Sequence, residues 1–205
     1  MTSDVTIDSG AAHAFTIPTD APEADGTIAW DNTTLIVVEL RAGGVREIGY
    51  TYGHSTGARV ARELIERHCL GQDPMATNAL FKAMRSSQRN YGAEGVAATA
   101  LSAVDIAIWD LKAKLLNLSL ASLLGVVRKA ALVYGSGGFT TYTDAQLTDQ
   151  LTGWVGQGIP RMKMKVGSQP ERDSHRIAVA RKAIGGDAEL FIDANGDYSR
   201  KQALR

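Results

Sequence analysis

The stretch "RMKMKVG" at residues 161–167 alternates apolar and charged side chains. Because successive side chains of a β-strand point to opposite faces, its two methionines and its valine would share one face, and Lys163 and Lys165 the other. The apolar face would pack against helices. The lysines would point either into solvent, as on any strand with one solvated face, or into an enclosed interior.

A second stretch, "LFIDANGDYS" at 190–199, repeats this arrangement with Asp193 and Asn195. The step from Lys163 to Asp193 is 30 residues, the length of a βαβ unit. Between the two stretches we expect a helix over 171–184, and repeated units of this kind predict parallel strands with right-handed crossovers. Further strands are expected over 131–138, 159–166 and 188–194, and another helix over 144–157.

The carboxyl ends of parallel strands are where a β/α barrel places its active site. Two lysines at i and i+2 on one strand lie about 6–7 Å apart, so each disfavours the proton of the other. Together with partial burial, this predicts a lowered lysine pKa and a general base. Asp193 offers the hard oxygen that Mg²⁺ prefers, and the ion would stabilise an enediolate formed beside a carboxylate.

The first part of the chain has a different pattern. A β-rich run at 33–40, a glycine turn at 42–44 and an alternating run at 45–50 predict a hairpin. Helices are expected from Ser55 or Thr56 through Leu70, from an Asp73-Pro74 start, over 94–116 with an Asp110–Lys114 pair, and over 119–125. We therefore predict an α+β domain over residues 1–128, followed by βα units over residues 129–205.

Composition excludes several classes of protein. The 205 residues are 44% hydrophobic, and Lys+Arg and Asp+Glu both number 22. The zero net charge gives no sign of a nucleic-acid or membrane partner, and the start "MTSDVTIDSG" is not that of a signal peptide. The single cysteine, Cys69, rules out an internal disulfide and fits a buried helix residue in a cytoplasmic protein.

Three motifs in order resemble the mandelate racemase and muconate lactonizing enzyme branch of the enolase superfamily. They are "ALSAVDIAIWDLKAKLLNLSLASLLG" at 100–125, "MKMKVG" at 162–167 and "LFIDANGDYS" at 190–199. The resemblance covers essentially the whole chain. It implies an α+β capping domain on a modified β/α barrel, with Mg²⁺ at the barrel mouth and a shared step that removes the proton α to a carboxylate.

The resemblance also implies site residues. Lys165 would be the base on one face of a small carboxylate substrate, and Lys163 would neutralise the substrate carboxylate and lower the pKa of Lys165. Asp193 would be the first metal ligand and Asn195 a polar neighbour that contacts substrate.

Two loops match the family segments that close over the barrel mouth, 18–28 and 50–56. In the second of these, Tyr50, Tyr52 and His54 are the candidates for contact with substrate. From the residues alone, the simpler interpretation of His54 is a solvated loop histidine.

A complete β/α barrel needs about 250 residues, whereas 75 residues, 131–205, follow the expected boundary. The family's other acidic metal ligands and its second acid/base would lie beyond Arg205. We therefore expect an incomplete barrel, weak or absent Mg²⁺ binding and no turnover by this chain alone. The alternatives are a non-catalytic or split-enzyme fragment that acts as a homo-oligomer or with a complementing chain, and a carboxylate-binding protein that uses the two lysines.

Overall fold

The computed structural model describes residues 5–90, 92 and 94–204. Contacts between residues divide the chain into two compact units. The first contains the residues up to Pro18 and Asn32–Val127, and the second contains Thr19–Asp31 and Arg128–Arg205. Residues 19–31 therefore belong with the second unit although they lie early in the sequence.

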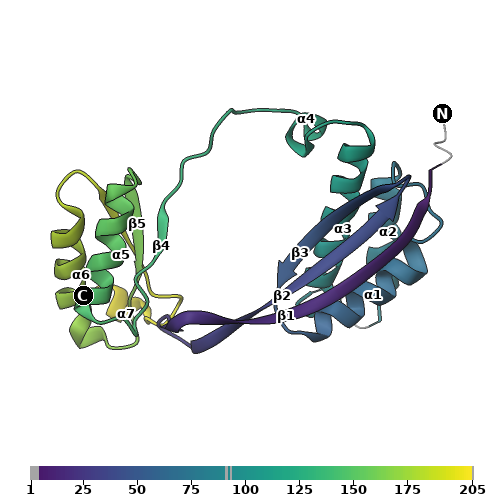
Figure 1. The fold of residues 1–205 in the computed structure, drawn as a ribbon. Helices are drawn as coiled ribbons and strands as arrows, with labels where there is room; N and C mark the ends of the chain where they lie inside the picture. The colour runs from purple at the N-terminus through teal and green to yellow at the C-terminus, as the bar shows by residue number, and fades with distance from the viewer. Residues whose placement is uncertain (1–4, 91, 93, 205) are drawn as a thin grey trace. The chain divides into compact units, whose positions relative to one another are not determined.

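The first unit contains a three-stranded sheet in the order β1-β2-β3 (Figure 1). Its strands are β1 Ile7–Ala24, β2 Ala29–Ala42 and β3 Val45–Tyr52. The predicted hairpin is confirmed: β2 and β3 pair antiparallel around a turn at Gly43 and Gly44, whose φ angles are 55° and 79°. Positive φ at both turn positions matches the twist of the flanking strands and favours glycine.

The expected loop at 18–28 is mostly strand, because β1 continues to Ala24 and β2 begins at Ala29. Pro18 and Pro22 suggested a loop. Both lie in β1, which is the edge strand of its sheet, and an edge strand tolerates a residue without an N–H.

Helices cover one face of this sheet (Figure 1). The Asp73-Pro74 helix start is wrong: the Asp73 carboxylate accepts a hydrogen bond from Met75 N at 2.8 Å, which forms a local turn, and the helix begins only at Thr77. The helices are α1 Thr56–His68, α2 Thr77–Ser87, α3 Val96–Leu115 and α4 Leu120–Leu124.

Helix α3 packs directly on β3 at Gly49. A Cβ on this glycine would lie 2.0 Å from Ala103 O and 2.5 Å from Ala107 N, both backbone atoms of α3. Since backbone cannot move aside cheaply, Gly49→Ala should destabilise the chain by about 3 kcal/mol, the upper end for overpacked cores. Urea unfolding followed by circular dichroism measures this. Gly153→Ala is the control, because a Cβ there meets nothing within 4 Å; equal losses in both variants would contradict the close packing.

Asp110 attracts Lys114 electrostatically, as expected, but the ion pair of Lys114 is with another element. Lys114 Nζ donates to Glu47 Oε1 of β3 at 2.6 Å, and the Glu47 side chain is only 6% exposed. Burial is the largest cause that raises the pKa of Glu47, followed by a hydrogen bond with Asp110, and together they outweigh Lys114.

This raised pKa has a defined effect on stability. A carboxyl whose pKa is higher folded than unfolded contributes most stability below its ordinary pKa of 4.5, and loses that contribution as pH rises through the folded value. The glutamine side chain in the variant Glu47→Gln does not titrate in this pH range. The unfolding free energy of the variant should therefore rise relative to wild type from pH 4.5 to neutral, as measured in urea at both pH values. A constant difference would contradict the shift.

The second unit contains three parallel strands in the order β4-β5-β6, which alternate with helices along the chain (Figure 1). The predicted βα pattern is confirmed, but the first strand is shorter than the expected 131–138. The elements are β4 Gly135–Gly137, α5 Asp144–Gly156, β5 Arg161–Lys165, α6 Pro170–Ile184, β6 Glu189–Asp193 and α7 Arg200–Ala203. With the preceding α+β unit, this is the fold class that the sequence predicts.

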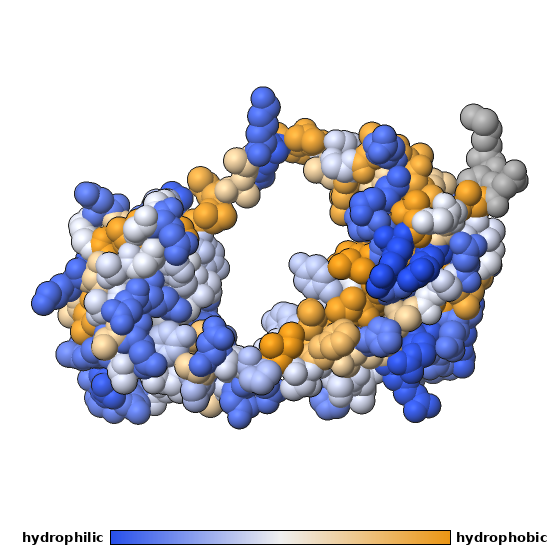
Figure 2. All heavy atoms as spheres, in the orientation of Figure 1, coloured by the Kyte–Doolittle hydropathy of each residue, from blue (hydrophilic) through white to orange (hydrophobic). Residues whose placement is uncertain are grey.

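The surface is mixed in character (Figure 2). Exposed apolar side chains occur on the first unit, for example Ile48, Leu116 and Leu124, and in the connection before β4, where Leu132 is 86% exposed. Among the described residues, no helix combines the length and apolar character needed to cross a membrane. Cys69 is fully buried, as expected, and burial raises the pKa of its thiol to about 12.

Candidate active site at the ends of the parallel strands

Strand β5 separates its side chains as the sequence pattern predicts. Met162, Met164 and Val166 are almost fully buried in the apolar core of the second unit. The side chains of Lys163 and Lys165 lie on the other face, 17% and 11% exposed. Both ammonium groups are therefore largely withdrawn from water beside the carboxyl end of the sheet.

The partner of both lysines is Asp193 at the end of β6. Its Oδ2 accepts from Lys163 Nζ at 3.0 Å and from Lys165 Nζ at 2.8 Å. Lys165 also donates to Asn195 Oδ1 at 2.5 Å. The parallel register places Lys165 directly opposite Asp193, so the structure brings these four predicted residues into one cluster.

Asn195 occupies a turn that favours its side chain. Its φ is 51°, in the left-handed region where asparagine is among the better-tolerated residues. Its backbone N–H donates to Asp193 Oδ1 at 3.0 Å. The turn thus binds the second carboxylate oxygen and aims the Asn195 amide at Lys165.

The electrostatics differ from the sequence prediction at Lys163. Burial lowers the pKa of this lysine, but hydrogen bonding and charge attraction from Asp193 outweigh burial and raise the pKa overall. Hydrogen bonds from Lys165, Lys163 and Asn195 N hold the pKa of Asp193 well below its usual range. The predicted mutual repulsion of the lysines is compensated by the carboxylate between them.

The oxygen atoms of Asp193 and Asn195 suit a hard divalent cation such as Mg²⁺. They form an incomplete ligand set, because the described part of the chain contains no group of three or more His, Cys, Asp or Glu side chains placed to hold a metal. The donor chemistry therefore fits Mg²⁺, but it accounts for only some of the six ligands that this ion requires.

The tip of the β1–β2 hairpin, residues 19–31, adds a wall to this site, at the place that the family resemblance implied for the segment 18–28. Asp25 is 7% exposed, and its Oδ1 accepts from Thr27 N at 2.7 Å and Ile28 N at 3.0 Å. Burial acts to raise the pKa of Asp25, but the hydrogen bonds from Ile28 and Thr27, with a smaller contribution from the charge of Lys165, outweigh burial and lower the pKa overall. A Cβ at Gly26 would lie 2.6 Å from the carbonyl oxygen of Ala194, so the tip touches the end of β6.

The same tip is bonded to the loop after β4. Thr140 N donates to Ala24 O at 2.9 Å, and Thr141 Oγ1 donates to Pro22 O at 2.6 Å. Trp30 meets the ring of Phe139 edge-on, with ring centroids 5.6 Å apart. Backbone and aromatic contacts therefore fix the tip over the strand ends.

Comparison with known proteins decides the family. Residues 15–125 match the family model for the mandelate racemase / muconate lactonizing enzyme N-terminal domain, and residues 146–205 match the enolase C-terminal domain-like model. The chain belongs to the mandelate racemase / muconate lactonizing enzyme family. The resemblance seen in the sequence motifs is confirmed.

Relatives in this family are enzymes. L-talarate/galactarate dehydratase of Salmonella typhimurium is 33% identical over 83% of this chain and 44% of the relative. D-galactarolactone cycloisomerase of Agrobacterium fabrum is 30% identical over 90% of this chain and 50% of the relative. The chain thus spans about half the length of the curated relatives it matches.

Solved structures agree with the fold. A mandelate racemase/muconate lactonizing enzyme-like protein from Rubrobacter xylanophilus matches with a TM-score of 0.92 and 48% identity, over 97% of this chain and 55% of that one. The Salmonella dehydratase, crystallised with Mg and L-lyxarohydroxamate, matches with a TM-score of 0.88 and 27% identity, over 99% and 55%. Mg²⁺ is therefore a metal of this family.

Three predicted substrate contacts of this family member lie in the first unit. Tyr50 and Tyr52 are on β3, with 61% and 75% of their surface exposed. His54 Nδ1 lies 2.9 Å from Thr56 Oγ1 and accepts from Thr56 N at 3.3 Å, so this imidazole caps the start of α1. Their contact with substrate stays a prediction.

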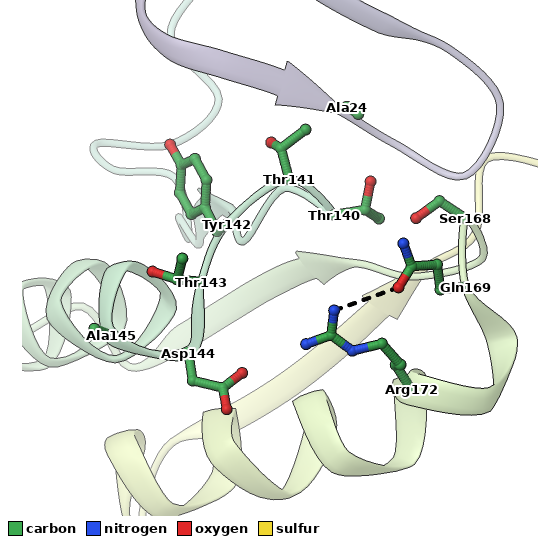
Figure 3. Close-up of a pocket in the computed structure, with 10 residues that line it drawn as sticks. All are labelled: Ala24, Thr140, Thr141, Tyr142, Thr143, Asp144, Ala145, Ser168, Gln169 and Arg172. Carbon is green, nitrogen blue, oxygen red and sulfur yellow. Dashed lines mark hydrogen bonds between the residues drawn. The ribbon is translucent and has the colours of Figure 1, made fainter.

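A separate polar cavity of about 690 Å³ lies in the second unit (Figure 3). Its walls come from Ala24, the loop 140–143, the first residues of α5 and the loop that enters α6. Arg172 and Gln169 meet on one side, with 3.3 Å between Nη1 and Oε1. The cluster of Lys163, Lys165, Asp193 and Asn195 does not line this cavity.

Proposed function

We propose that this chain contributes the base and the first metal ligand of a Mg²⁺-dependent enzyme that removes the proton α to the carboxylate of a small hydroxy acid of the acid-sugar class. The observation that carries the proposal is the cluster of Lys163, Lys165, Asp193 and Asn195. The names of the two curated relatives support the substrate class.

Each side chain has a distinct task in this proposal. Lys165 Nζ, in its neutral form, accepts the α-proton, and Lys163 stays charged and neutralises the substrate carboxylate. The raised pKa of Lys163 suits the second task, since a lysine that keeps its proton is a permanent cation. Asn195 orients Lys165 through its amide oxygen.

Asp193, with Asn195 beside it, would hold the metal together with further oxygen ligands, which this cluster does not supply. Bound Mg²⁺ would supply Lewis-acid stabilisation of the negative charge that develops on the substrate carboxylate. The chain's own contribution is to keep the lysines largely out of water and 2.8–3.0 Å from the same carboxylate oxygen. Whether the proton returns or a hydroxyl leaves depends on the group on the opposite face of the substrate.

A second candidate is carboxylate binding without turnover. It is favoured by the single carboxylate in the cluster and by the absence of a three-residue metal group among the described residues. The two lysines alone would then bind an anion. Self-association, or pairing with a complementing chain, remains a prediction that accompanies this candidate.

Exchange of the substrate α-proton separates the two candidates. The native protein from its source should catalyse exchange of the α-proton of aldaric and aldonic acids with D₂O, seen by proton NMR, and EDTA should stop it. The purified 205-residue chain should show no exchange and weak Mg²⁺ binding by calorimetry. A native protein that binds these acids without metal and without exchange would support the binding function instead.

A further inference from the structure

Charged side chains are rarely buried unless they have partners, and three are buried among the described residues of the second unit. One is Asp25 of the hairpin tip, and the others are Asp173 and Arg176 of α6, 7% and 4% exposed. The two α6 residues are three positions apart, on the face that also carries the buried Ala180 and Ile184. Apolar residues would fill such positions if packing were their only purpose.

Arg176 binds the loop that follows β4. Its Nη2 donates to Gly138 O at 3.0 Å and to Phe139 O at 2.9 Å, and its Nη1 donates to Tyr142 O at 3.0 Å. Gly138 O also accepts the backbone N–H of Lys165 at 3.0 Å. One carbonyl oxygen therefore joins the buried guanidinium to the backbone of the proposed base.

The loop held by Arg176 is the one on which the hairpin tip rests. Phe139 contacts Trp30, and Thr140, the next residue, donates to Ala24 O. A change at Arg176 should therefore reach the tip as well as the strand.

Asp173 binds the loops that follow β5 and β6. Its Oδ2 accepts from Gly167 N at 3.0 Å and from the hydroxyl of Tyr198. Gly167 lies two residues after Lys165, and Tyr198 three residues after Asn195. Burial and the hydrogen bond to Asp173 raise the pKa of Tyr198 to about 12, so its hydroxyl remains a donor.

We propose that Asp173 and Arg176 are positioning residues: they hold the loops after all three parallel strands, and through them Lys165, Asn195 and the hairpin tip, in the geometry of the site. The proposal rests on the proposed function only in the task it gives Lys165; the mechanical part stands on the contacts alone. Among the described residues, no hydrogen bond or ion pair joins either side chain to Lys163, Lys165, Asp193 or Asn195, so we assign neither a catalytic role.

Amide hydrogen exchange by NMR tests the mechanical part in the 205-residue chain. Arg176→Lys keeps the charge but loses the planar fork that reaches three carbonyls. Exchange at Lys165 N and Thr140 N should become roughly tenfold faster, as expected for a lost hydrogen bond to a charged group. Exchange at Leu151 in the core of α5 should stay within about twofold. Arg172→Lys, an exposed change on the same helix (Figure 3), should alter none of these amides.

Tyr198→Phe is a mild test of Asp173, because it removes the hydrogen bond from the Tyr198 hydroxyl and leaves the one from Gly167 N. Exchange at Asp197 N, which donates to Ala194 O in the loop after β6, should become faster while Gly167 N is unchanged. Asp173→Ala should accelerate both. If exchange at Leu151 accelerated as much as exchange at the loop and strand-end amides named above, the two residues would only stabilise the fold as a whole, and the proposal would be overturned. Unchanged exchange at those amides would overturn it as well.

Kinetics of the native protein provide a readout that loss of fold would not give. Arg176→Lys should lower kcat about tenfold with KM within about twofold, because misplacing a catalytic group affects the reacting geometry more than ground-state binding. A change in KM alone would contradict positioning of the base. If wild type shows no turnover, the proposed function fails, while the amide exchange result still decides whether the two α6 residues hold the loops.

Discussion

Lys165→Arg should lower α-proton exchange by the native protein about 10³-fold, within the range that a general base contributes, and leave its fold intact. Arginine keeps the positive charge beside Asp193, but a guanidinium cannot give up its proton near neutral pH and so cannot accept one from substrate. The variant thus removes the base while keeping a positive charge beside Asp193, to which Lys165 Nζ lies at 2.8 Å. Proton NMR in D₂O measures the exchange rate, and circular dichroism the fold.

Lys163→Arg is the matched comparison on the same strand. Since Lys163 is assigned a permanent charge, arginine should weaken substrate binding more than the exchange rate at saturation. Lys182→Arg on the exposed face of α6 should change neither. Comparable loss at saturation in Lys163→Arg and Lys165→Arg would show that the lysines are not divided into base and cation. Unchanged exchange in Lys165→Arg would exclude Lys165 as the base.

The predictable part of this fold depends on periodicity. Alternation in 161–167 fixed which residues of β5 face the core, and the 30-residue step between Lys163 and Asp193 predicted parallel neighbours. Local signals failed where a tertiary contact or a competing turn decided the outcome. Asp73 satisfies a local turn instead of capping a helix, and the apolar residues at 131–134 have no strand partner, so β4 begins only at Gly135.

The candidate site was predictable in identity but not in electrostatics. Spacing places Lys163, Lys165 and Asp193 at adjacent strand ends, yet it does not reveal that one carboxylate oxygen accepts from both lysines. That geometry reverses the expected direction of the Lys163 pKa. Asp173 and Arg176 did carry a signal, since both fall on the apolar stripe of α6.

The family resemblance placed the segment 18–28 over the barrel mouth, but local sequence patterns could not predict the contacts of the hairpin tip, because its partners are distant in the chain. Gly26 lies against residues 166, 194 and 197, about 140 to 170 positions away. No local sequence pattern encodes contacts across such a separation. Closing a loop of this length costs entropy, which is offset only by contacts made in the folded state. A glycine is required at position 26 by the lack of space for a Cβ and not by backbone conformation, because Gly26 is not among the residues with positive φ.

Gly26→Ala should therefore displace the tip from the strand ends. The new Cβ would lie 2.6 Å from Ala194 O and 2.9 Å from Val166 O, and neither backbone oxygen can yield without moving β5 or β6. We expect a cost of about 2 kcal/mol for the seated tip, typical of overpacking, which corresponds to roughly 30-fold faster exchange at Thr140 N. The fluorescence of Trp30 should change as its contact with Phe139 is lost.

Gly186→Ala is the control for this variant, since a Cβ there meets nothing within 4 Å in the same unit. Trp30→Phe, made in both backgrounds, assigns the fluorescence change to the tip and not to Trp109 or Trp154. Because Asp25 and the tip wall the site beside Lys165, Gly26→Ala should also slow α-proton exchange by the native protein, whereas Gly186→Ala should not. Unchanged Thr140 exchange and Trp30 emission in Gly26→Ala would show that the hairpin tip keeps its position. The strand ends would then tolerate the added methyl group, and the tip would be held only by its contacts with the loop after β4.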